Sequence, residues 1–488
     1  MQLQDFKHLA QDYTAIPVYR RLMADVLTPV SLFLSLRSEA HYPFLLESVE
    51  GGEQVARYSF LGRNPYQVLR YNGQEVTLEK EGSSEKLDRS YFEALKDFTT
   101  RHSEPELPNL PRLSGGAVGF SSYDTVREVE ELTNTPEADI TIPEAIWAFY
   151  DEIFAFDHVK QQVIIIKTVF VDEEKDDPEA LYNEAQQRLD ELEELVYQPE
   201  RQSDPFSIKP DQLTSNVSQP EFEEMVRKAK EYIYEGDIFQ VVLSQRFETD
   251  FSGDRFMLYR ALRMVNPSPY LFFLDFDEFA LVGSSPEVLV RVQDDTAQLL
   301  PIAGTRPRGK TPEEDLELEQ DLKNDPKEIA EHVTLVDLGR NDLSRVCKPA
   351  TVKPVREQVI ERYSHVMHIV SDVKGELAEE QTAVDALMRC FPAGTVSGAP
   401  KIRAMEIIDE LEPTKRGPYA GAVGYFDFSG NMDTCIVIRT MLVTDSKVYI
   451  QAGAGIVADS DPEKEYLETK NKAGALVEAL SVALSITE

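Results

Sequence analysis

The sequence predicts an α+β protein, and three features of the chain indicate this class. Strand-like apolar runs and amphipathic helices are mixed along the whole chain, which is typical of α+β folds. At 488 residues the chain is too long for one ordinary hydrophobic core, so two domains or two fused halves are expected. Hydrophobic residues make up 42% of the chain, and this content excludes a disordered protein.

A faint internal repeat indicates that the two halves are related. Residues 57–71 match residues 278–292 at a glycine, a proline and several apolar positions, and residues 115–124 resemble residues 421–430. The spacings are loose, so chance similarity between hairpins with glycine turns is the alternative. If the repeat is genuine, the halves are related sheets that pack together.

The first half begins with alternating strands and short helices. Apolar and β-branched runs predict strands over residues 27–36, 42–49 and 56–62. The spacing of apolar residues predicts a helix over residues 91–102, and residues 153–169 are typical of a β-hairpin. These elements account for most of the apolar residues of this half.

A long charged helix over residues 178–197 precedes the best domain boundary in the chain. The stretch after it is polar and contains proline, as linkers commonly are. We therefore expect an N-terminal domain over residues 1–200, a linker over 201–219 and a catalytic domain over 220–488. The second domain opens with a helix that starts at Pro220, followed by a strand and further mixed elements.

The composition excludes several classes of protein. The chain has 50 Lys and Arg residues against 87 Asp and Glu residues, a net charge of −37, which repels nucleic acid and anionic membranes. No stretch reaches the roughly 18 uncharged apolar residues that span a bilayer, and the first residues do not resemble a signal peptide. Three widely spaced cysteines exclude a disulfide framework. We expect a cytoplasmic protein.

Two predicted helices carry pairs of glutamates at the same spacing. Residues 325–332 and 461–468 both open with Asp-Pro, a strong helix start. The glutamates are three residues apart in each helix, so both project from one face. Four carboxylates on two such helices could surround one hard cation, although Mg2+ binds only one or two of them directly. The glutamates are Glu328, Glu331, Glu465 and Glu468.

The same glutamates have an explanation without a metal. Glu328 is the third residue after Asp325, where a capping-box glutamate belongs. Glu465 and Glu468 could form an exposed helix face that pairs with neighbouring lysines. Spacing alone does not decide between these hypotheses.

Three loops rich in glycine and threonine suggest a binding site for carboxylates. They cover residues 301–309, 391–401 and 451–462, and small residues let backbone N–H groups approach an anion closely. Arg439 ends the predicted strand CIVIR in the same domain and offers a bidentate fork to a carboxylate. Simple turn chemistry explains each loop alone, but the set favours a small dianionic substrate.

The motifs of the second half resemble those of a known family. They are VTLVDLGRNDLSRV, YSHVMHIVSDVKGEL, FPAGTVSGAPKIRAMEII, GPYAGAVGYF, CIVIRT and AGAGIVADSDPEKEYLETKNKA, in that order over residues 220–475. This series resembles the successive motifs of the chorismate-binding enzymes. The resemblance implies two packed antiparallel β-sheets flanked by helices, a four-layer α/β/β/α sandwich.

The resemblance also implies chorismate as substrate and Mg2+ as cofactor, with the metal on the ring carboxylate of chorismate. Its main ligands would be Glu331 and Glu468, with Glu328 and Glu465 close by. Glu287 matches the general acid that protonates the hydroxyl group leaving C4. The remaining substrate positions are His368 and Thr395 beside the ring, Arg439 at the enolpyruvyl carboxylate, and Gly304, Thr305, Tyr419, Gly453, Ala454, Gly455 and Lys472.

Two of these residues have ordinary explanations without the family. His368 alternates with Val366 and Val370 on a predicted strand, where a histidine usually belongs to the core. Glu287 could simply satisfy a turn. In the internal repeat, Tyr66 stands where the second copy has Glu287, so only the second half is expected to carry the chemistry.

Two positions separate the reactions within the family. Members that add water to chorismate carry a lysine base where this chain has Gln240, and a neutral amide cannot deprotonate water. Members that aminate C4 commonly carry a nucleophilic lysine where this chain has Ala303. The remaining reaction is attack of ammonia at C2, which gives anthranilate and pyruvate. Aminodeoxychorismate synthesis at C4 is the alternative.

Residues 45–51 and 266–273 resemble the tryptophan-sensing elements of anthranilate synthase large subunits. The resemblance implies feedback inhibition by tryptophan and, as the source of ammonia, a separate glutamine amidotransferase subunit in a heterodimer or heterotetramer. A tryptophan-binding regulator without catalysis is a further alternative, although it would be expected to lose the catalytic residues. The inhibitor pocket would consist of Ser48, Pro269, Tyr270, Leu271, Gly424 and Tyr425.

Overall fold

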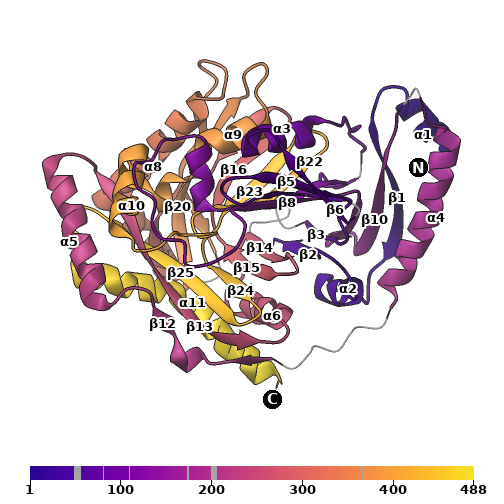
Figure 1. Ribbon diagram of the computed structural model, residues 1–488. Coiled ribbons are helices and arrows are strands. Elements are labelled where there is room, and N and C mark those ends of the chain that lie inside the picture. Colours follow the sequence, from indigo (N-terminus) through magenta and orange to yellow (C-terminus); the bar gives the residue numbers. More distant parts are fainter. Residues whose placement is uncertain are drawn as a thin grey trace.

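Two large antiparallel β-sheets pack face to face in the computed structural model, with helices on both outer faces (Figure 1). The predicted fold class, an α/β/β/α sandwich, is therefore confirmed. Among the residues that the structure describes, no helix is long and apolar enough to cross a membrane. The described residues are 1–48, 57–80, 82–108, 110–172, 175–198, 206–363 and 366–487.

The first sheet contains strands from both halves of the chain. β12 (Thr214–Ser215) and β21 (Gly398–Ala399) pair with one of its edge strands, β13. The strand order is β1 (Ala15–Met23), β10 (Gln162–Phe170), β9 (Glu152–Asp157), β3 (Tyr58–Gly62), β2 (Phe44–Glu47), β14 (Tyr270–Asp275), β15 (Phe279–Ser285), β24 (Thr440–Thr444), β25 (Lys447–Ile456), β13 (Gln240–Ser252) and β11 (Ser207–Ile208).

The second sheet also combines both halves. Its strand β20 pairs on one side with β19 (Lys353–Arg362) as well as with β18. The order is β18 (Ile302–Pro307), β20 (Val366–Glu376), β17 (Thr296–Leu299), β16 (Val288–Gln293), β23 (Met432–Ile436), β22 (Ala422–Asp427), β7 (Gly116–Ser121), β8 (Ala145–Tyr150), β4 (Gln67–Tyr71), β5 (Val76–Lys80) and β6 (Ser83–Leu87).

The strand order bears out the predicted internal repeat. In the first sheet, the series β2, β3, β9, β10, β1 runs outward from the centre on one side, and β14, β15, β24, β25, β13 on the other. In the second sheet β7 and β22 meet at the centre, where Gly119 pairs with Gly424. Each half crosses once from the first sheet to the second in this region, from β3 to β4 and from β15 to β16. Tyr66 lies at the first crossing and Glu287 at the second.

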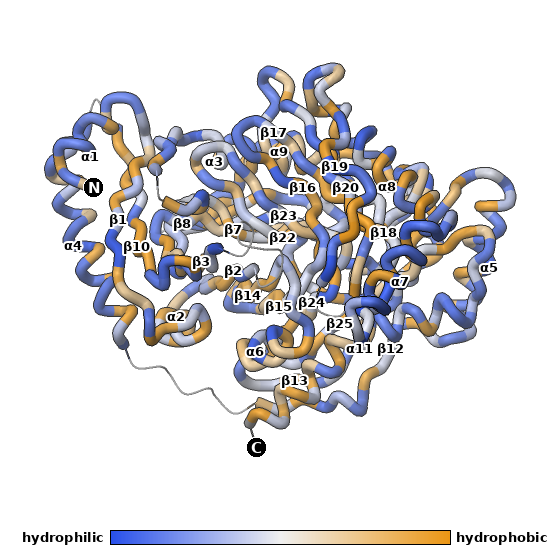
Figure 2. The backbone as a smooth tube through the Cα atoms, turned by 180° about the vertical axis from the view of Figure 1, so that it is seen from behind, coloured by the Kyte–Doolittle hydropathy of each residue, from blue (hydrophilic) through white to orange (hydrophobic). Residues whose placement is uncertain are grey.

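Three apolar layers hold the sandwich together. Side chains such as Phe120, Ile146 and Phe272 fill the space between the sheets, and each fully buried side chain of this size contributes about 2 kcal/mol. In Figure 2 the strands carry apolar segments, whereas α4 and α7 are largely hydrophilic. The outer layers are made by α1 (Leu3–Leu9), α2 (Pro29–Leu36), α4 (Pro178–Val196), α6 (Phe256–Val265) and α11 (Pro462–Thr487) on the first sheet, and by α3 (Tyr91–Thr100), α8 (Pro326–Ser344) and α9 (Ala383–Cys390) on the second.

Two further helices pack beside β13, and these elements frame the site. α5 (Gln219–Glu235) begins with a capping box at Ser218 and ends at Gly236, whose φ of 87° lies in the left-handed region. α10 (Lys401–Leu411) also packs against β13. The remaining elements are α7 (Pro312–Asn324), η1 (Tyr123–Glu128), η2 (Pro210–Gln212) and η3 (Gly394–Val396).

Most of residues 27–36 form the helix α2 (Pro29–Leu36), so the prediction of a strand there was wrong. Thr28 accepts a hydrogen bond from the Ser31 N–H at 3.0 Å, and the Ser31 hydroxyl accepts one from the Thr28 N–H at 2.9 Å. Pro29 follows at the first helical position. A short apolar run fits a buried strand and a buried helix equally well; the capping residues were the signal that distinguishes them.

The other predicted elements of the first half are confirmed as β2, β3, α3, the β9–β10 hairpin and α4. The domain boundary stays a prediction, and residues 201–205 of the predicted linker lie outside the described residues. Both sheets run through strands of both halves, so the halves share their apolar layers.

Candidate active site

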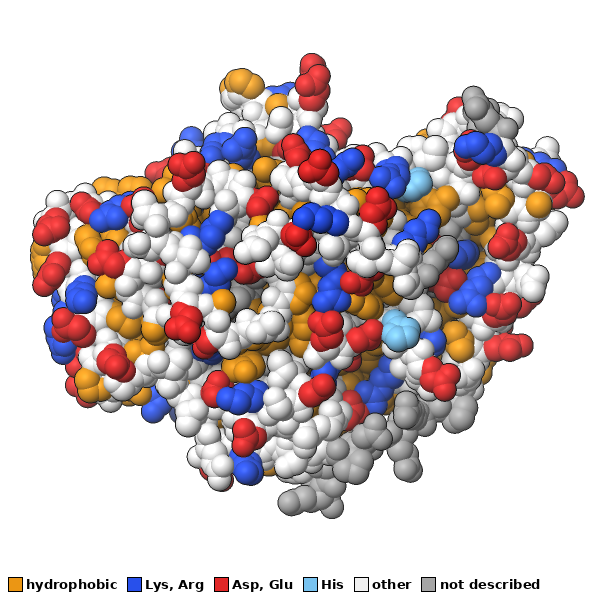
Figure 3. All heavy atoms as spheres, in the orientation of Figure 1, with side chains coloured by type: hydrophobic (Ala, Val, Ile, Leu, Met, Phe, Trp, Pro, Cys, Tyr) orange, Lys and Arg blue, Asp and Glu red, His pale blue; other side chains and the backbone are white. Residues whose placement is uncertain are grey.

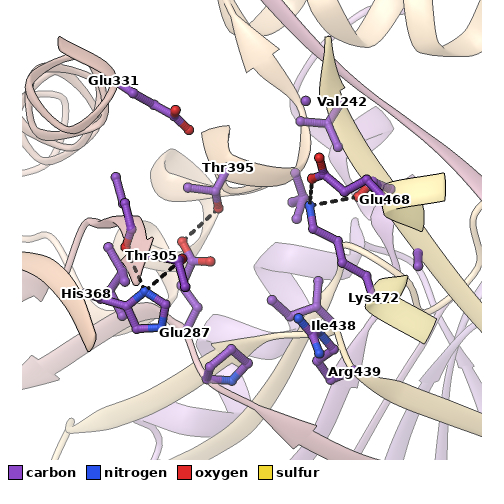
Figure 4. A pocket seen from close by; sticks show the side chains of 18 of the residues that line it. Val242, Glu287, Thr305, Glu331, His368, Thr395, Ile438, Arg439, Glu468 and Lys472 are labelled. Atoms are coloured by element: carbon purple, nitrogen blue, oxygen red, sulfur yellow. Dashed lines mark hydrogen bonds and ion pairs between the residues drawn. The ribbon is translucent and has the colours of Figure 1, made fainter. Parts of the chain in front are cut away.

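A cavity of about 1310 Å³ opens in the second half of the chain. Its walls come from β13, β18, β20 and β25, from the helices α8 and α11, and from the loops before β16, η3 and β24. Most of the predicted catalytic and substrate-binding residues line this one cavity (Figure 4). Ala454 does not, because alternate residues of β25 face opposite ways and its side chain is buried in the core.

Glu287 occupies the crossing between the two sheets. Pro286 and Glu287 connect β15 to β16, and the Ile436 N–H donates to the Glu287 carbonyl at 3.0 Å. The Thr395 hydroxyl donates to the Glu287 carboxyl at 2.8 Å. The backbone of the crossing is therefore fixed by Ile436, and the carboxyl group that faces the cavity is fixed by Thr395.

The surroundings of Glu287 keep its carboxyl group close to half-protonated at neutral pH. Burial raises its pKa from the ordinary value of 4.5 to about 7, although the Thr395 hydroxyl and the Lys472 charge both act to lower it. A carboxylic acid with this pKa can donate a proton at physiological pH. The predicted role of Glu287 as a general acid is consistent with this electrostatic setting.

His368 is held as a neutral imidazole beside Thr305. Its Nδ1 lies 2.8 Å from the Gly304 carbonyl oxygen and 3.2 Å from the Thr305 hydroxyl. Because a carbonyl only accepts hydrogen bonds, Nδ1 carries the hydrogen and Nε2 is an acceptor in the neutral form. Burial lowers the pKa of His368, which favours that form. Gly304 has a φ of 68°, and a Cβ atom there would lie 2.9 Å from Leu322.

Arg439 provides an uncompensated positive charge in a strongly acidic protein. It lies in the loop between β23 and β24 with a φ of 51°, so the strand that was predicted to end at Arg439 ends at Ile436. Burial lowers the pKa of the guanidinium. No acidic partner for it is found in the described part of the chain, which leaves its hydrogen-bond fork for an anion in the cavity.

Lys472 projects from α11 into the same cavity, and its ammonium group points toward Glu468 (Figure 4). Its ammonium group donates to the Gly453 carbonyl at 3.0 Å and pairs with the Glu468 carboxylate at 2.7 Å. Tyr419 closes this side, and a Cβ atom at Gly453 would lie only 2.6 Å from the Tyr419 hydroxyl. The glycine therefore lets the backbone of β25 approach the cavity.

Gln240 and Ala303 also line the cavity. A Cβ atom at Gly455 would lie 2.8 Å from the Gln240 Nε2 atom, so the amide rests on the glycine surface of β25. Ala303 is buried in β18. Neither position provides a base or a nucleophile.

The four predicted metal-binding glutamates surround the entrance of the cavity unequally. Glu331, Glu465 and Glu468 line the cavity, but Glu328 turns toward Arg306, whose Nη1 atom lies 3.6 Å from its carboxylate. Asp325 caps α8 by accepting from the N–H groups of residues 327 and 328, as predicted. Across the described ranges, no three acidic, histidine or cysteine side chains converge closely enough to hold one metal ion.

The charges of these glutamates nevertheless reinforce one another. Burial, followed by the negative charge of Glu328, raises the pKa of Glu331, and Glu468 adds to the effect. Burial also raises the pKa of Glu465, again with a contribution from Glu468. Carboxylate oxygens are the ligands that Mg2+ prefers, and a divalent cation would relieve the repulsion between these negative charges. The residue types therefore fit Mg2+, although the side chains do not converge on one point.

The predicted inhibitor-pocket residues meet on the other side of the crossing. Tyr270 donates to the Asp433 carboxylate at 2.7 Å, and Asp433 is the pairing neighbour of Tyr425. Leu271 pairs with Glu47, directly before Ser48, and Gly424 precedes Tyr425 on β22. Pro269 lines the large cavity itself. The structure thus brings these residues into one region next to the active site.

Sequence reasoning missed several residues of the site. Lys327 and Lys464 line the cavity, and their position after the two Asp-Pro helix starts was a usable signal. Gln451 lines it too and donates to the Ser244 hydroxyl at 2.8 Å. Arg416 supports the site from behind. Nothing in the spacing of the sequence marks Gln451 or Arg416.

Comparisons with known proteins agree with this geometry. The family model described as chorismate binding enzyme matches residues 42–478. The anthranilate synthase component 1 of Acetivibrio thermocellus is 49% identical over 489 residues, covering 99% of this chain and 98% of that protein.

Solved structures lead to the same family. Anthranilate synthase component I from Streptococcus pneumoniae has a TM-score of 0.75 and 38% identity, covering 94% of this chain and 99% of the other. The menaquinone-specific isochorismate synthase of Escherichia coli has a TM-score of 0.71 at 20% identity, covering 98% of each chain, and shares the fold. The chain belongs to the chorismate-binding enzymes and, within them, to the anthranilate synthase component 1 family.

Proposed function

We propose that this chain is the chorismate-converting subunit of a cytoplasmic anthranilate synthase, a lyase that turns chorismate and ammonia into anthranilate, pyruvate and water. The observation that carries the proposal is the cavity chemistry around Glu287. A carboxyl group with a pKa of about 7 faces a cavity in which positions 240 and 303 carry no lysine. The family membership supplies chorismate as the substrate.

The first half of the reaction needs an acid. Ammonia attacks C2 of the ring, both conjugated ring double bonds shift, and the bond between C4 and its hydroxyl oxygen breaks. Hydroxide is a poor leaving group, so Glu287 donates its proton and water departs. Arg439 holds the enolpyruvyl carboxylate through its unused fork, which fixes the ring relative to Glu287.

The second half of the reaction needs a base. A proton leaves C2, its electron pair completes the aromatic ring, and the bond from the ring to the enolpyruvyl oxygen breaks. The enolpyruvate that is released takes up a proton on its CH2 carbon and becomes pyruvate. Neutral His368 has an unprotonated Nε2 atom, which suits a proton acceptor in the cavity. Aromatisation makes this step favourable, and the protein contributes position.

Production of anthranilate by the isolated chain tests the proposal directly. Purified protein with chorismate, an ammonium salt at alkaline pH and MgCl2 should show anthranilate fluorescence. We expect Glu287→Gln to reduce kcat by about 10²- to 10⁴-fold, the usual loss of a general acid. Chromatographic detection of isochorismate or aminodeoxychorismate in place of anthranilate would refute the assignment.

We further propose that Mg2+ binds between α8 and α11, with Glu331 and Glu468 as its main ligands and Glu328 and Glu465 nearby. When bound, the ion would stabilise negative charge on the ring carboxylate. Titration calorimetry with MgCl2 measures this without turnover. Glu331→Gln and Glu468→Gln should each abolish the binding heat. Glu463→Gln, on α11 like Glu468, is the control and should retain it.

The ammonia source is proposed to be a glutamine amidotransferase subunit, in a heterodimer or a heterotetramer. The name component 1 of the relatives supports a partner component. Ammonia is mostly protonated at neutral pH, so a partner that releases it next to the cavity would remove the dependence on alkaline pH. Glutamine should support anthranilate formation only after the partner is added.

Inhibition by tryptophan is proposed at the region of Ser48, Tyr270 and Tyr425. Pro269 belongs to the proposed inhibitor region and also lines the active-site cavity, which supports a link between inhibitor binding and substrate binding. An inhibitor must bind the inactive arrangement more tightly than the active one. Calorimetry should show tryptophan binding to the parent chain and weaker binding to Ser48→Ala, with chorismate opposing it in both.

A further inference from the structure

A buried ion pair lies directly behind the active-site cavity. Arg416 and Glu412 belong to the segment between α10 and β22, and their side chains are only 1% and 3% exposed. The Arg416 Nη2 atom lies 2.6 Å from one Glu412 oxygen, and its Nε atom lies 2.9 Å from the other. The pair is therefore bidentate. Neither residue lines the active-site cavity.

Arg416 uses its remaining hydrogens on two segments that build the cavity. Nη1 donates to the Val396 carbonyl at 2.7 Å, and Nη2 donates to the Val242 carbonyl at 2.7 Å. Val396 directly follows Thr395, the residue that donates to Glu287. Val242 lies two residues after Gln240 on β13. One guanidinium thus joins two segments that line the cavity, the one that carries Thr395 and the strand β13.

The same ion pair contacts two further parts of the site. The Arg416 guanidinium lies 5.5 Å from the ring centre of Tyr419, which lines the cavity. Glu412 accepts hydrogen bonds from the Ser244 N–H at 2.8 Å and from the Ser244 hydroxyl at 2.9 Å. Ser244 in turn accepts from Gln451 in the cavity wall. Both members of the pair therefore contact segments that line the cavity.

We infer that Arg416, paired with Glu412, is a positioning residue that sets the orientation of Thr395 and Tyr419 and thereby the proton-donating state of Glu287. A lysine cannot replace it, because a single ammonium group cannot reach the two carbonyls and both carboxylate oxygens in their fixed planar arrangement. The inference rests on the proposed function, in which Glu287 is the acid. It adds a residue outside the cavity to the proton-transfer machinery.

A purely structural ion pair would behave differently, and the pKa of Glu287 separates the two roles. The Thr395 hydroxyl lowers the pKa of Glu287. If Arg416→Lys lets residues 394–397 move, that hydrogen bond lengthens and the pKa of Glu287 rises. Loss of stability alone has no such effect.

The experiment compares Arg416→Lys with Arg37→Lys. Arg37, the residue directly after α2, forms a similar bidentate pair with Asp254, at 2.8 and 2.7 Å, and neither residue lines the active-site cavity. For each variant, the pKa of Glu287 is measured by NMR of protein labelled at the glutamate carboxyl carbons, with Glu287→Gln used to assign the signal. Melting temperature and the pH dependence of kcat/KM are measured on the same samples.

We expect Arg416→Lys to raise the pKa of Glu287 and to lower kcat/KM by about 10- to 100-fold, as small misplacements do. Arg37→Lys should lower the melting temperature without either effect. An unchanged Glu287 pKa in a folded Arg416→Lys variant would overturn the inference. Should that variant fail to fold, Glu412→Gln, which retains the contacts to Ser244, takes its place under the same criteria. Because the NMR measurement needs no turnover, its outcome stands apart from a failure to make anthranilate.

Discussion

Glu287 is close to half-protonated at neutral pH because the effect of burial outweighs two opposing effects. Burial disfavours its charged form, whereas the Thr395 hydroxyl and the Lys472 ammonium group favour it. The result is a pKa of about 7, some way above the ordinary value of 4.5. A solvent-exposed glutamate with the ordinary pKa of 4.5 would be almost fully ionised at physiological pH and could not donate a proton. The proposed chemistry therefore needs the carboxyl group to be enclosed where the chain crosses between the sheets.

The pH dependence of the reaction should report this pKa. At a fixed concentration of free NH3, kcat/KM for chorismate is expected to fall as pH rises through about 7, because the acid form of Glu287 is lost. Thr395→Val removes a hydrogen bond that lowers the pKa, so its descending limb should lie at higher pH. Thr395→Ser keeps the hydroxyl and is the matched control. Identical limbs in all three proteins would contradict the assignment of Glu287.

Glu104 is a second buried carboxyl group, outside the active site. Burial raises its pKa from 4.5 to about 8 despite a hydrogen bond from Ser114, and its Oε2 atom has no hydrogen-bond partner. In the unfolded chain the group ionises near its ordinary value. Glu104 is neutral in both states below pH 4.5, where it has no cost to folding. As pH rises from about 4.5 to about 8, the unfolded chain loses the proton first, so the free energy of unfolding falls.

Glu104→Gln removes the ionisable group but keeps a polar side chain of the same size. At pH 5 the variant and the parent should have similar free energies of unfolding in urea. At pH 9 the variant should be more stable by about 2 kcal/mol, since only the parent then carries the cost of a buried charge or of its protonation. A stability difference that does not change with pH would show that Glu104 is solvated.

At the scale of elements, a hydrogen-bonded triad fastens the two sheets beside the crossing. Tyr270 of β14 belongs to the first sheet, and Arg291 of β16 and Asp433 of β23 belong to the second. The Arg291 Nε atom donates to Asp433 at 3.0 Å, and its Nη2 atom donates to the Tyr270 oxygen at 2.8 Å. Glu287 lies four residues before Arg291 in sequence, so movement of the sheets relative to each other is opposed close to the acid.

Double-mutant cycles measure the strength of this inter-sheet contact. Asp433→Asn leaves a largely buried arginine without its charge partner and should cost about 2 kcal/mol in unfolding free energy. Tyr270→Phe removes one hydroxyl and should cost about 1 kcal/mol. If the triad acts as a unit, the double variant costs less than the sum of the single variants. Strict additivity would show that the two sheets are held independently of it.

Local signals in the sequence predicted the elements well where capping residues were recognised. Asp325 caps α8 and Gly236 ends α5, as expected from residue type alone. The repeat also led to the expectation that only the second half carries the chemistry, and the cavity that contains Glu287 is lined by residues of that half. The helix at residues 29–36 was missed because an apolar run has no clear period when most of its faces are buried.

Contacts between distant segments could not be predicted from one sequence. Arg416 reaches the carbonyls of Val242 and Val396, which are 174 and 20 residues away. Such contacts depend on how the strands are ordered in each sheet, and the spacing of residues along the chain does not predict that order. The pair between Lys472 and Glu468 is different, because the two residues are one helical turn apart and pairing of Glu468 with a neighbouring lysine was expected from spacing alone.

At the scale of the whole molecule, duplication explains why one half has the chemistry. Tyr66 and Glu287 lie at equivalent crossings between the sheets. The ring of Tyr66 packs against Phe149 and Phe170, with ring centres 6.4 and 5.2 Å apart. An aromatic ring thus occupies the place that carries the carboxyl group of Glu287 in the other half. The first half supports the second through the shared sheets.

The net charge of −37 is the other property of the whole molecule. Figure 3 shows acidic side chains spread over one face, with basic side chains among them. Excess charge of one sign destabilises the compact state by self-repulsion, and salt screens it. At about 0.01 M salt the Debye length is about 30 Å, but at about 1 M it is only about 3 Å. The melting temperature should therefore rise with KCl concentration.

A charge variant separates this repulsion from general effects of salt on apolar burial. Glu184, Glu194 and Glu317 are exposed on α4 and α7, so replacing all three with lysine lowers the net negative charge without touching the core. We expect the triple variant to melt at a higher temperature than the parent at low salt, by a few degrees, and to gain less from added KCl. Differential scanning calorimetry over a series of KCl concentrations measures both quantities. If parent and variant gain equally from KCl, salt acts through the apolar core, and the acidic surface has no cost to stability.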